Sequence, residues 1–295
     1  MPAKALLVGI NDYAPVGPGG PDLRGCVPDV QDAASTLVAL GIVSPSPRNL
    51  RILTDARATR ANIMTGLRWL LTPAAGVDRL IFHYSGHGSQ LPNIGGDEEV
   101  DGLDETICPH DYATACMIRD DDFQQLFQTL KPGVVLEAIL DSCHSGTGTR
   151  DLAAMAALPE RQQVTVRYVE PPLDASFFIN SNPTLPSRGV MKAATTREAV
   201  VVCDMKWVLW AACRSNQTAS ETAIDGTHRG VFSYCFFKAL RRTSARIPRR
   251  KLDSLVSTAV ARMGFSQVPQ LEGNAVDLGE DVFKEVPLAA KKARA

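Results

Sequence analysis

The chain has 295 residues, of which 45% are hydrophobic, and its 31 Lys and Arg residues nearly balance its 32 Asp and Glu residues. This length and apolar content predict a globular protein with a sizeable core. The even charge balance argues against a nucleic-acid binder, because phosphate binding needs a basic excess or stripe. There is no signal-peptide pattern and no apolar stretch long enough to span a membrane, so we expect a cytoplasmic protein. The seven cysteines include no CxxC pair, which argues against a disulfide framework and a zinc knuckle.

Strands and helices are expected to alternate along the first half of the chain. Strands are predicted at Ala3–Ile10, Asn49–Leu53, Asp78–Tyr84 and Val134–Leu140, and helices at Pro28–Leu40, from Thr59 to Leu71, and from the acidic run Asp120-Asp121-Asp122. A long polar loop is expected between the third strand and the acidic run. The alternation predicts a parallel sheet that helices cover on both faces.

The second half is less regular. From Gly146 to about Val190 the periodicity fades and Pro and Arg become frequent, which is typical of a linker or an insertion. Beyond it, a strand is predicted at Lys206–Cys213 and helices at Gly230–Leu240 and Leu252–Met263.

Two of the predicted strands end in glycine-flanked polar segments, HYSGHGSQ around His87 and LDSCHSG around Cys143. The carboxyl ends of parallel strands meet at one edge of a sheet, so the imidazole and the thiol are expected to face each other across a cleft. An imidazole lowers the pKa of a neighbouring thiol and later protonates a leaving amine. The backbone N–H groups of Gly88 and Cys143 are our candidates for an oxyanion hole. The sequence therefore predicts a nucleophilic cysteine, Cys143, with His87 as its base.

Other interpretations of these residues stay open. A cysteine at a strand end is often a buried core residue, and a histidine in a glycine turn is often a surface residue. His83, His110 and His144 are rival bases, but His83 lies inside a strand, His110 lies far along the loop, and His144 adjoins the thiol in sequence.

The two segments, in this order and 56 residues apart from His87 to Cys143, resemble those of the caspase-like cysteine peptidases, and of the metacaspases in particular. The resemblance extends over most of the chain and includes Asp22–Ala33 and Cys213–Glu221. DSC stands here where caspases carry a QAC-type sequence, which favours a metacaspase. The resemblance implies a caspase-like three-layer αβα sandwich with a mostly parallel central sheet.

The resemblance also implies a domain organisation. Residues 1–290 are expected to form a single peptidase domain, followed by a tail at 291–295. Within the domain, residues 1–145 would match a large subunit that carries the histidine and the cysteine. Residues 146–190 would be a linker or insertion, and residues 191–290 would match a small subunit.

Metacaspases cleave after Arg or Lys, and the resemblance places an acidic substrate pocket at Cys26, Asp29, Ser85 and Asp141. Two carboxylates around one guanidinium favour Arg over Lys, because they can make bidentate bonds. Pro28 replaces an Asn that is usual in the early loop of the family. The alternative for Asp29 is that it merely caps the following helix.

Many metacaspases bind activating Ca²⁺, and the matching residues here are Asp104, Asp120 and Asp121, although a helix N-terminus also favours such charges. No cofactor is expected for the chemistry itself. The analogy with metacaspases also favours a monomer.

The function expected is that of a cysteine endopeptidase acting on peptides or proteins with Arg or Lys at the cleavage position. Self-processing is expected within Gly146–Val190, at Arg161 or Arg167, because a tethered flexible segment is present at high effective concentration. The alternative is that Val164, Val166 and Tyr168 order this segment as a hairpin that resists cleavage. Other functions considered are a legumain- or separase-like peptidase and a catalytically silent scaffold or adaptor.

Overall fold

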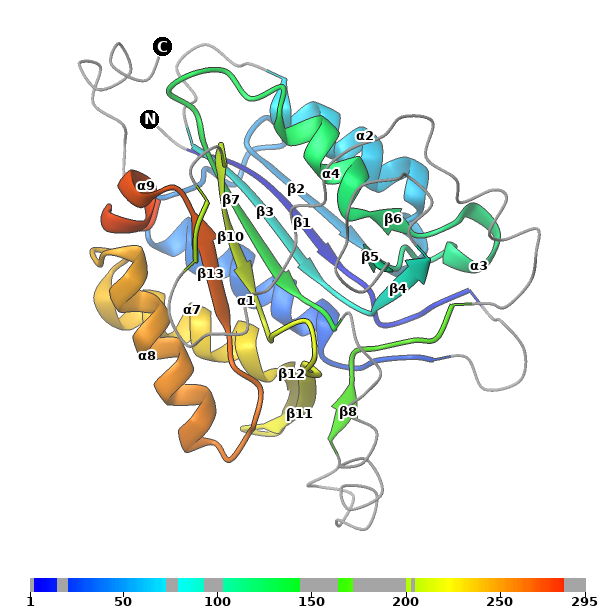
Figure 1. The fold of residues 1–295 in the computed structure, drawn as a ribbon. Helices are drawn as coiled ribbons and strands as arrows, with labels where there is room; N and C mark the ends of the chain where they lie inside the picture. The colour runs from blue at the N-terminus through cyan, green and yellow to red at the C-terminus, as the bar shows by residue number, and fades with distance from the viewer. Residues whose placement is uncertain are drawn as a thin grey trace.

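A computed structural model of the chain describes residues 3–14, 21–72, 79–92, 103–143, 164–171, 200–202 and 205–283. Within these ranges a seven-stranded sheet has the order β2-β1-β3-β7-β10-β13-β9 (Figure 1). Its strands are β1 (Lys4–Gly9), β2 (Leu50–Thr54), β3 (Arg79–Ser85), β7 (Val135–Asp141), β9 (Val200–Val201), β10 (Trp207–Ala211) and β13 (Gln270–Gly273). Neighbouring strands are parallel except for β10 and β13, which are antiparallel.

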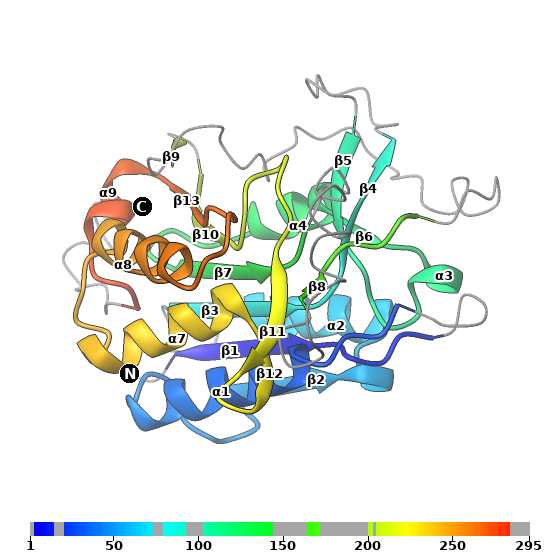
Figure 2. The ribbon, with the colours of Figure 1, turned by 90° about the horizontal axis from the view of Figure 1, so that it is seen from below.

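Helices cover both faces of this sheet. The residues of β1 alternate between two apolar clusters, with Leu7 on one side and Leu6 and Val8 on the other. The first cluster receives α1 (Cys26–Ala39), α7 (Val231–Thr243) and α8 (Arg249–Arg262). The second receives α2 (Arg60–Leu71) and α4 (Asp120–Phe127). Figure 2 shows α7 and α8 in front of the sheet and α2 and α4 behind it, which confirms the predicted three-layer αβα arrangement.

The prediction of a long polar loop after the third strand is wrong. The chain here forms a small antiparallel sheet of β4 (Gly88–Pro92), β5 (Leu103–Ile107) and β6 (Ile118–Arg119), with the short helix α3 (Tyr112–Ala115) before β6. Short strands that bury both apolar and polar side chains, such as Ile107 and Thr106, carry little of the alternation by which strands are recognised.

A second three-stranded sheet lies near the carboxyl ends of β3 and β7, as Figures 1 and 2 show. The hairpin of β11 (Ser220–Ile224) and β12 (Thr227–Gly230) forms two of its strands, and β8 (Thr165–Val166) pairs antiparallel with β11. The last described helix is α9 (Ala275–Gly279). Among the described residues, no helix has the length and apolar character that crossing a bilayer requires.

Candidate active site

Two tyrosines hold the glycine turn that follows β3. The Tyr84 hydroxyl lies 2.6 Å from the His87 carbonyl oxygen and 2.9 Å from the Cys108 carbonyl oxygen, so its one hydrogen is shared between the two. The Tyr13 hydroxyl accepts a 2.7 Å bond from the backbone N–H of His87. A Cβ at Gly86 would lie 2.4 Å from the Tyr84 hydroxyl oxygen, so this close approach requires glycine. The turn therefore fixes the backbone on both sides of the imidazole.

The imidazole of His87 has a defined tautomer. Its Nε2 lies 2.5 Å from the carbonyl oxygen of Pro21, and a carbonyl can only accept, so Nε2 carries the proton. Nδ1 is buried and has no hydrogen-bond partner among the described residues. Burial lowers the pKa of His87 to about 4, so the ring is neutral near pH 7. With Nε2 protonated, the lone pair of the neutral ring lies on Nδ1.

Cys143 lies two residues beyond the end of β7, which is the parallel neighbour of β3 with Ser85 opposite Asp141. The thiol is fully buried and contacts the backbone of Ala219. The Ala219 N–H donates to the sulfur at 2.6 Å, and the thiol donates to the Ala219 carbonyl oxygen at 3.0 Å. The two predicted catalytic segments therefore lie at adjacent strand ends, although thiol and imidazole do not hydrogen-bond each other here.

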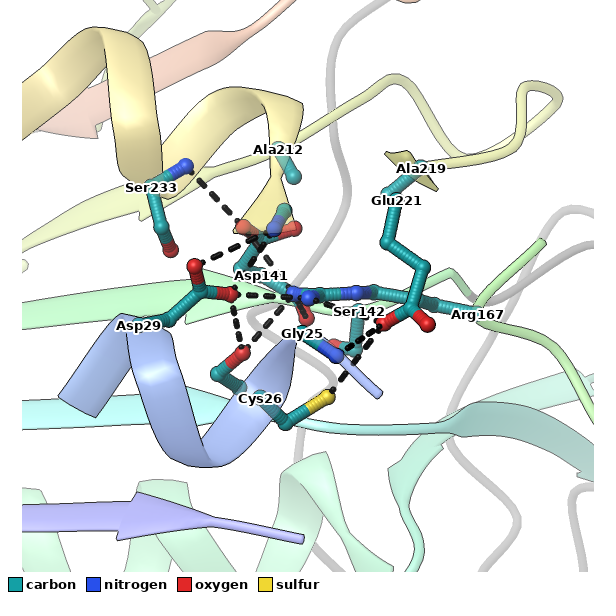
Figure 3. Close-up of polar contacts among 12 residues, drawn as sticks. Gly25, Cys26, Asp29, Asp141, Ser142, Arg167, Ala212, Ala219, Glu221 and Ser233 are labelled. Carbon is teal, nitrogen blue, oxygen red and sulfur yellow. Dashed lines mark hydrogen bonds and ion pairs between the residues drawn. The ribbon is translucent and has the colours of Figure 1, made fainter. Parts of the chain in front are cut away.

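An acidic pocket holds the side chain of Arg167 (Figure 3). The guanidinium is fully buried. It forms ion pairs with Asp29 at 2.8 Å, Asp141 at 3.0 Å and Glu221 at 3.3 Å, and it donates to the Ser85 hydroxyl at 2.8 Å. Burial lowers the pKa of Arg167, but Asp141 and other acidic neighbours raise it well above its usual value, so the guanidinium stays charged.

Backbone amides help to hold the negative charge of this pocket. The Gly230 N–H, at the start of α7, donates to both oxygens of Asp29, at 3.1 and 3.0 Å. The Ser233 N–H donates to Asp141 at 3.0 Å, so the positive end of the α7 dipole faces the carboxylates. Burial raises the pKa of Asp29 to about 7, although Arg167 opposes this rise.

The backbone of Arg167 lies against the catalytic segments. Its carbonyl oxygen accepts hydrogen bonds from the N–H groups of Gly88, at 2.9 Å, and Cys143, at 3.2 Å. Its own N–H donates to the Ala219 carbonyl oxygen at 3.0 Å, continuing the pairing of β8 with β11. The two amides predicted as an oxyanion hole therefore converge on one carbonyl, that of the Arg167–Tyr168 peptide bond.

The structure brings together all the residues predicted for the catalytic centre and the pocket. The thiol of Cys26 is fully buried and donates to a Glu221 oxygen at 3.9 Å. Asp29 is not a helix cap, because the first amides of α1 donate to the Asn11 side chain instead. Sequence reasoning missed Glu221, Pro21 and Ala219. A signal for Glu221 was present, since it ends the Cys213–Glu221 segment of the resemblance.

Two of the three rival histidines, His83 and His110, make other contacts. His83 is buried within β3, with its Nδ1 3.1 Å from the Ile139 carbonyl oxygen and its ring against Phe237. His110 contacts the Asp12 carbonyl oxygen at 2.6 Å. His144, Arg150, Arg161 and Arg188 lie outside the described residues.

The three acids matched to a calcium site lie on β5 and at the start of α4. The Asp104 carboxylate forms a buried ion pair with the Arg119 guanidinium. Asp120 accepts a 2.9 Å bond from the Asp121 N–H. In the described part of the chain, no group of three or more His, Cys, Asp or Glu is placed to hold a metal ion. In this arrangement the Arg119 guanidinium neutralises Asp104, and binding of Ca²⁺ at these residues stays a prediction.

Comparison with known proteins gives both a family and a fold. Residues 3–152 match the family model described as "Metacaspase, peptidase C14 domain". The chain is 32% identical to Metacaspase-1A of Aspergillus terreus, over 91% of this chain and 69% of that protein. It is also 32% identical to Metacaspase-1 of Emericella nidulans, over 92% of this chain and 70% of that protein.

A solved structure of a Geobacter sulfurreducens protein superposes with a TM-score of 0.63 and covers 97% of this chain and 100% of that chain. Because the two sequences are 24% identical, the likeness shows a shared fold alone. Together with the family match, it confirms the predicted caspase-like fold class.

Proposed function

Since the chain belongs to the metacaspases, which are cysteine-type endopeptidases, we propose that it cleaves peptide bonds after arginine with Cys143 and His87 as its catalytic pair. The observation that carries this proposal is the position of Arg167. Its guanidinium lies in the acidic pocket while its carbonyl oxygen accepts from the amides of Gly88 and Cys143. A substrate arginine bound in the same way would place its scissile bond beside the thiol.

The chemistry follows from these contacts. The Nδ1 lone pair of His87 takes the thiol proton, and the sulfur turns from Ala219 to attack the carbonyl carbon. Negative charge that develops on the carbonyl oxygen is stabilised by the Gly88 and Cys143 amides. His87 then protonates the leaving amine, and water hydrolyses the thioester. The Pro21 carbonyl keeps the other ring nitrogen protonated throughout.

Arginine fits this pocket better than lysine. Three carboxylates and the Ser85 hydroxyl contact different edges of the guanidinium, and a planar fork of five N–H donors can reach all of them. An ammonium group has three donors around one nitrogen and would leave buried carboxylate oxygens without partners, which costs free energy. We therefore propose that arginine is preferred over lysine at the cleavage position.

Self-processing is the second part of the proposal, at the Arg167–Tyr168 bond. Within residues 164–171, the segment around this bond is bound in an extended form, with β8 beside β11. Of the two arginines predicted as cleavage positions, Arg161 lies outside the described residues and Arg167 lies in the pocket.

Mass spectrometry of the purified protein tests this proposal. We expect the wild type to give two fragments, one that ends at Arg167 and one that begins at Tyr168. Arg167→Gln should remain intact at this bond, because the uncharged glutamine side chain cannot form ion pairs in the acidic pocket. Arg161→Gln is the matched control, and we expect it to be cut normally. An uncut wild type that hydrolyses arginine peptides would contradict self-processing and leave the peptidase proposal standing.

The affinity of the pocket for a guanidinium should depend on pH. The pKa of Asp29 is about 7 with Arg167 bound, and the guanidinium is a cause that lowers it, so an empty pocket holds the Asp29 proton more tightly. Binding above pH 7 therefore releases a proton, and the affinity should rise with pH there. Calorimetry with agmatine, on a chain carrying both Cys143→Ala and Arg167→Ala, measures this without catalysis. Adding Asp29→Asn should remove the rise of agmatine affinity with pH. If the rise persisted in this variant, another titrating group would be its cause.

Four expectations stay predictions: regulation by Ca²⁺, the single-domain organisation over residues 1–290, the monomeric state and the cytoplasmic location. Calorimetry with Ca²⁺ tests the first of them most directly. A heat signal that Asp120→Ala removes would mean that Arg119 leaves Asp104 when the ion binds. If millimolar Ca²⁺ gave no heat signal, the role of Asp104 would be its ion pair with Arg119 and not Ca²⁺ binding.

A further inference from the structure

We infer that Gly88 and Ser89, at the start of β4, form a substrate subsite on the leaving-group side of the scissile bond, which selects an aromatic and then a β-branched residue after the arginine. This inference rests on the proposed function and extends it to the residues after the cleavage position. Its basis is the way in which Tyr168 and Val169 are held.

Both backbone groups of Val169 are bound by this segment. The Val169 N–H donates to the Gly88 carbonyl oxygen at 3.1 Å, and the Ser89 hydroxyl donates to the Val169 carbonyl oxygen at 2.7 Å. Gly88 and Tyr168 form a parallel β-bridge. The Ser89 side chain is fully buried, so its hydroxyl is a fixed donor rather than a solvated surface group. The substrate backbone therefore stays extended for two residues beyond the scissile bond.

The side chains of these two residues contact different parts of the core. Tyr168, which is half-buried, packs against the cluster beneath α1 and α7, whereas Val169 packs against the cluster beneath α2 and α4. Successive side chains that point to opposite sides are what an extended strand requires. Glycine at either position would leave these apolar surfaces uncovered, so the subsite favours a large aromatic residue and then a branched aliphatic one.

Gly88 joins the two sides of the cleavage position. Its N–H donates to the carbonyl of the scissile bond, while its own carbonyl accepts from the second residue beyond that bond. A Cβ at Gly88 would lie 1.9 Å from the Cys143 carbonyl oxygen, so only glycine fits here. Pairing with Val169 fixes the Gly88–Ser89 peptide group, which adjoins the His87–Gly88 peptide group whose N–H binds the developing oxyanion. Residues after the cleavage position should therefore affect catalysis as well as binding.

Paired substrates test this inference on the full-length protein. The reference substrate is a fluorescence-quenched peptide containing Val-Thr-Val-Arg-Tyr-Val-Glu. The second substrate is the same peptide with N-methylvaline after the tyrosine. The third substrate is Val-Thr-Val-Arg joined to aminomethylcoumarin, which has no residue after the arginine. N-methylation removes the donor to the Gly88 carbonyl, and we expect kcat/KM to fall at least about tenfold on the wild type. Replacing the tyrosine by glycine should lower it by a similar factor.

Ser89→Ala provides the complementary change in the protein. We expect the ratio of kcat/KM between the quenched peptide and the coumarin amide to fall about tenfold, because only the peptide has the carbonyl that Ser89 binds. Ser254→Ala, at a hydroxyl that bonds to Arg250 on the exposed side of α8, is the matched control and should leave the ratio unchanged.

The inference would be overturned if the N-methylated and unmodified peptides were cleaved at equal rates and the ratio in Ser89→Ala were unchanged. Hydrolysis of the coumarin amide in the same experiment would still support the proposed function. Failure of the wild type to cleave any of the three substrates would overturn the proposed function itself. Because the N-methylated peptide is measured on the wild type, the result does not depend on how well Ser89→Ala folds.

Discussion

We expect Cys143→Ala to lower kcat/KM on arginine peptides by at least about 10⁴-fold and to leave the Arg167–Tyr168 bond uncut, because no other group supplies the attacking sulfur. The amides of Gly88 and Cys143 and the acidic pocket stay in place in this variant, so substrate binding should persist. The loss should therefore appear in kcat, with little change in the dissociation constant of an arginine ligand.

The matched control for this change is Cys235→Ala. Cys235 lies on α7 in the same apolar cluster as Cys143 and is almost fully buried, with its sulfur 3.6 Å from the Met263 sulfur. Both variants remove one buried sulfur atom, so their effects on thermal stability should be comparable. We expect the control to retain turnover within a few-fold of the wild type. Appreciable turnover in Cys143→Ala, or equal losses in both variants, would contradict the role of Cys143 as nucleophile.

The position of the candidate catalytic residues was predictable from the sequence because it depends on local signals. His87 and Cys143 each follow a predominantly apolar strand, and adjacent parallel strands end at a common edge. The glycines that flank the histidine predicted a tight turn, but the hydrogen bonds of this turn to Tyr13 and Tyr84 could not be recognised in the sequence. The contribution of Pro21 could not be foreseen, since it depends on where a loop after β1 lies relative to β3.

The acidic pocket was predictable only in part. The family resemblance gave Asp29, Ser85 and Asp141, which lie on a helix and two strands that the alternating pattern predicts. Glu221 comes from a hairpin near the carboxyl ends of the strands, and hairpin position depends on tertiary packing rather than on periodicity. Gly230 also contributes, because a Cβ there would lie 2.3 Å from an Asp141 oxygen, and nothing in the local sequence indicates this contact.

The choice between Arg161 and Arg167 could not be made from the sequence, because both lie in a segment without periodicity. The register of β8 on β11 brings Arg167 into the pocket, because Thr165 pairs with Glu221 and Val166 with Ser220, and Arg167 is therefore the position that we propose. A strand of two residues has no pattern that would reveal its register.

Specificity for arginine should depend most strongly on Asp141. Its carboxylate lies 3.0 Å from the Arg167 guanidinium, both side chains are fully buried, and its backbone carbonyl oxygen accepts a second guanidinium bond at 3.2 Å. Removing one charge from a buried ion pair costs roughly 3–5 kcal/mol, so we expect Asp141→Asn to lower kcat/KM on arginine peptides about 10²- to 10³-fold. Ser85→Ala removes a neutral partner worth roughly 1 kcal/mol and should cost about tenfold or less.

A citrulline peptide separates the charge of Asp141 from its structural role, because citrulline has the shape of arginine without the charge. Asparagine can still accept from the Ser233 N–H, so the start of α7 should keep its position in Asp141→Asn. We therefore expect the rate ratio between arginine and citrulline peptides to fall steeply in Asp141→Asn and little in Ser85→Ala. If Asp141→Asn lowered both rates by the same factor, Asp141 would act by holding α7 and the turn after β7, and recognition of the positive charge would rest on Asp29 and Glu221.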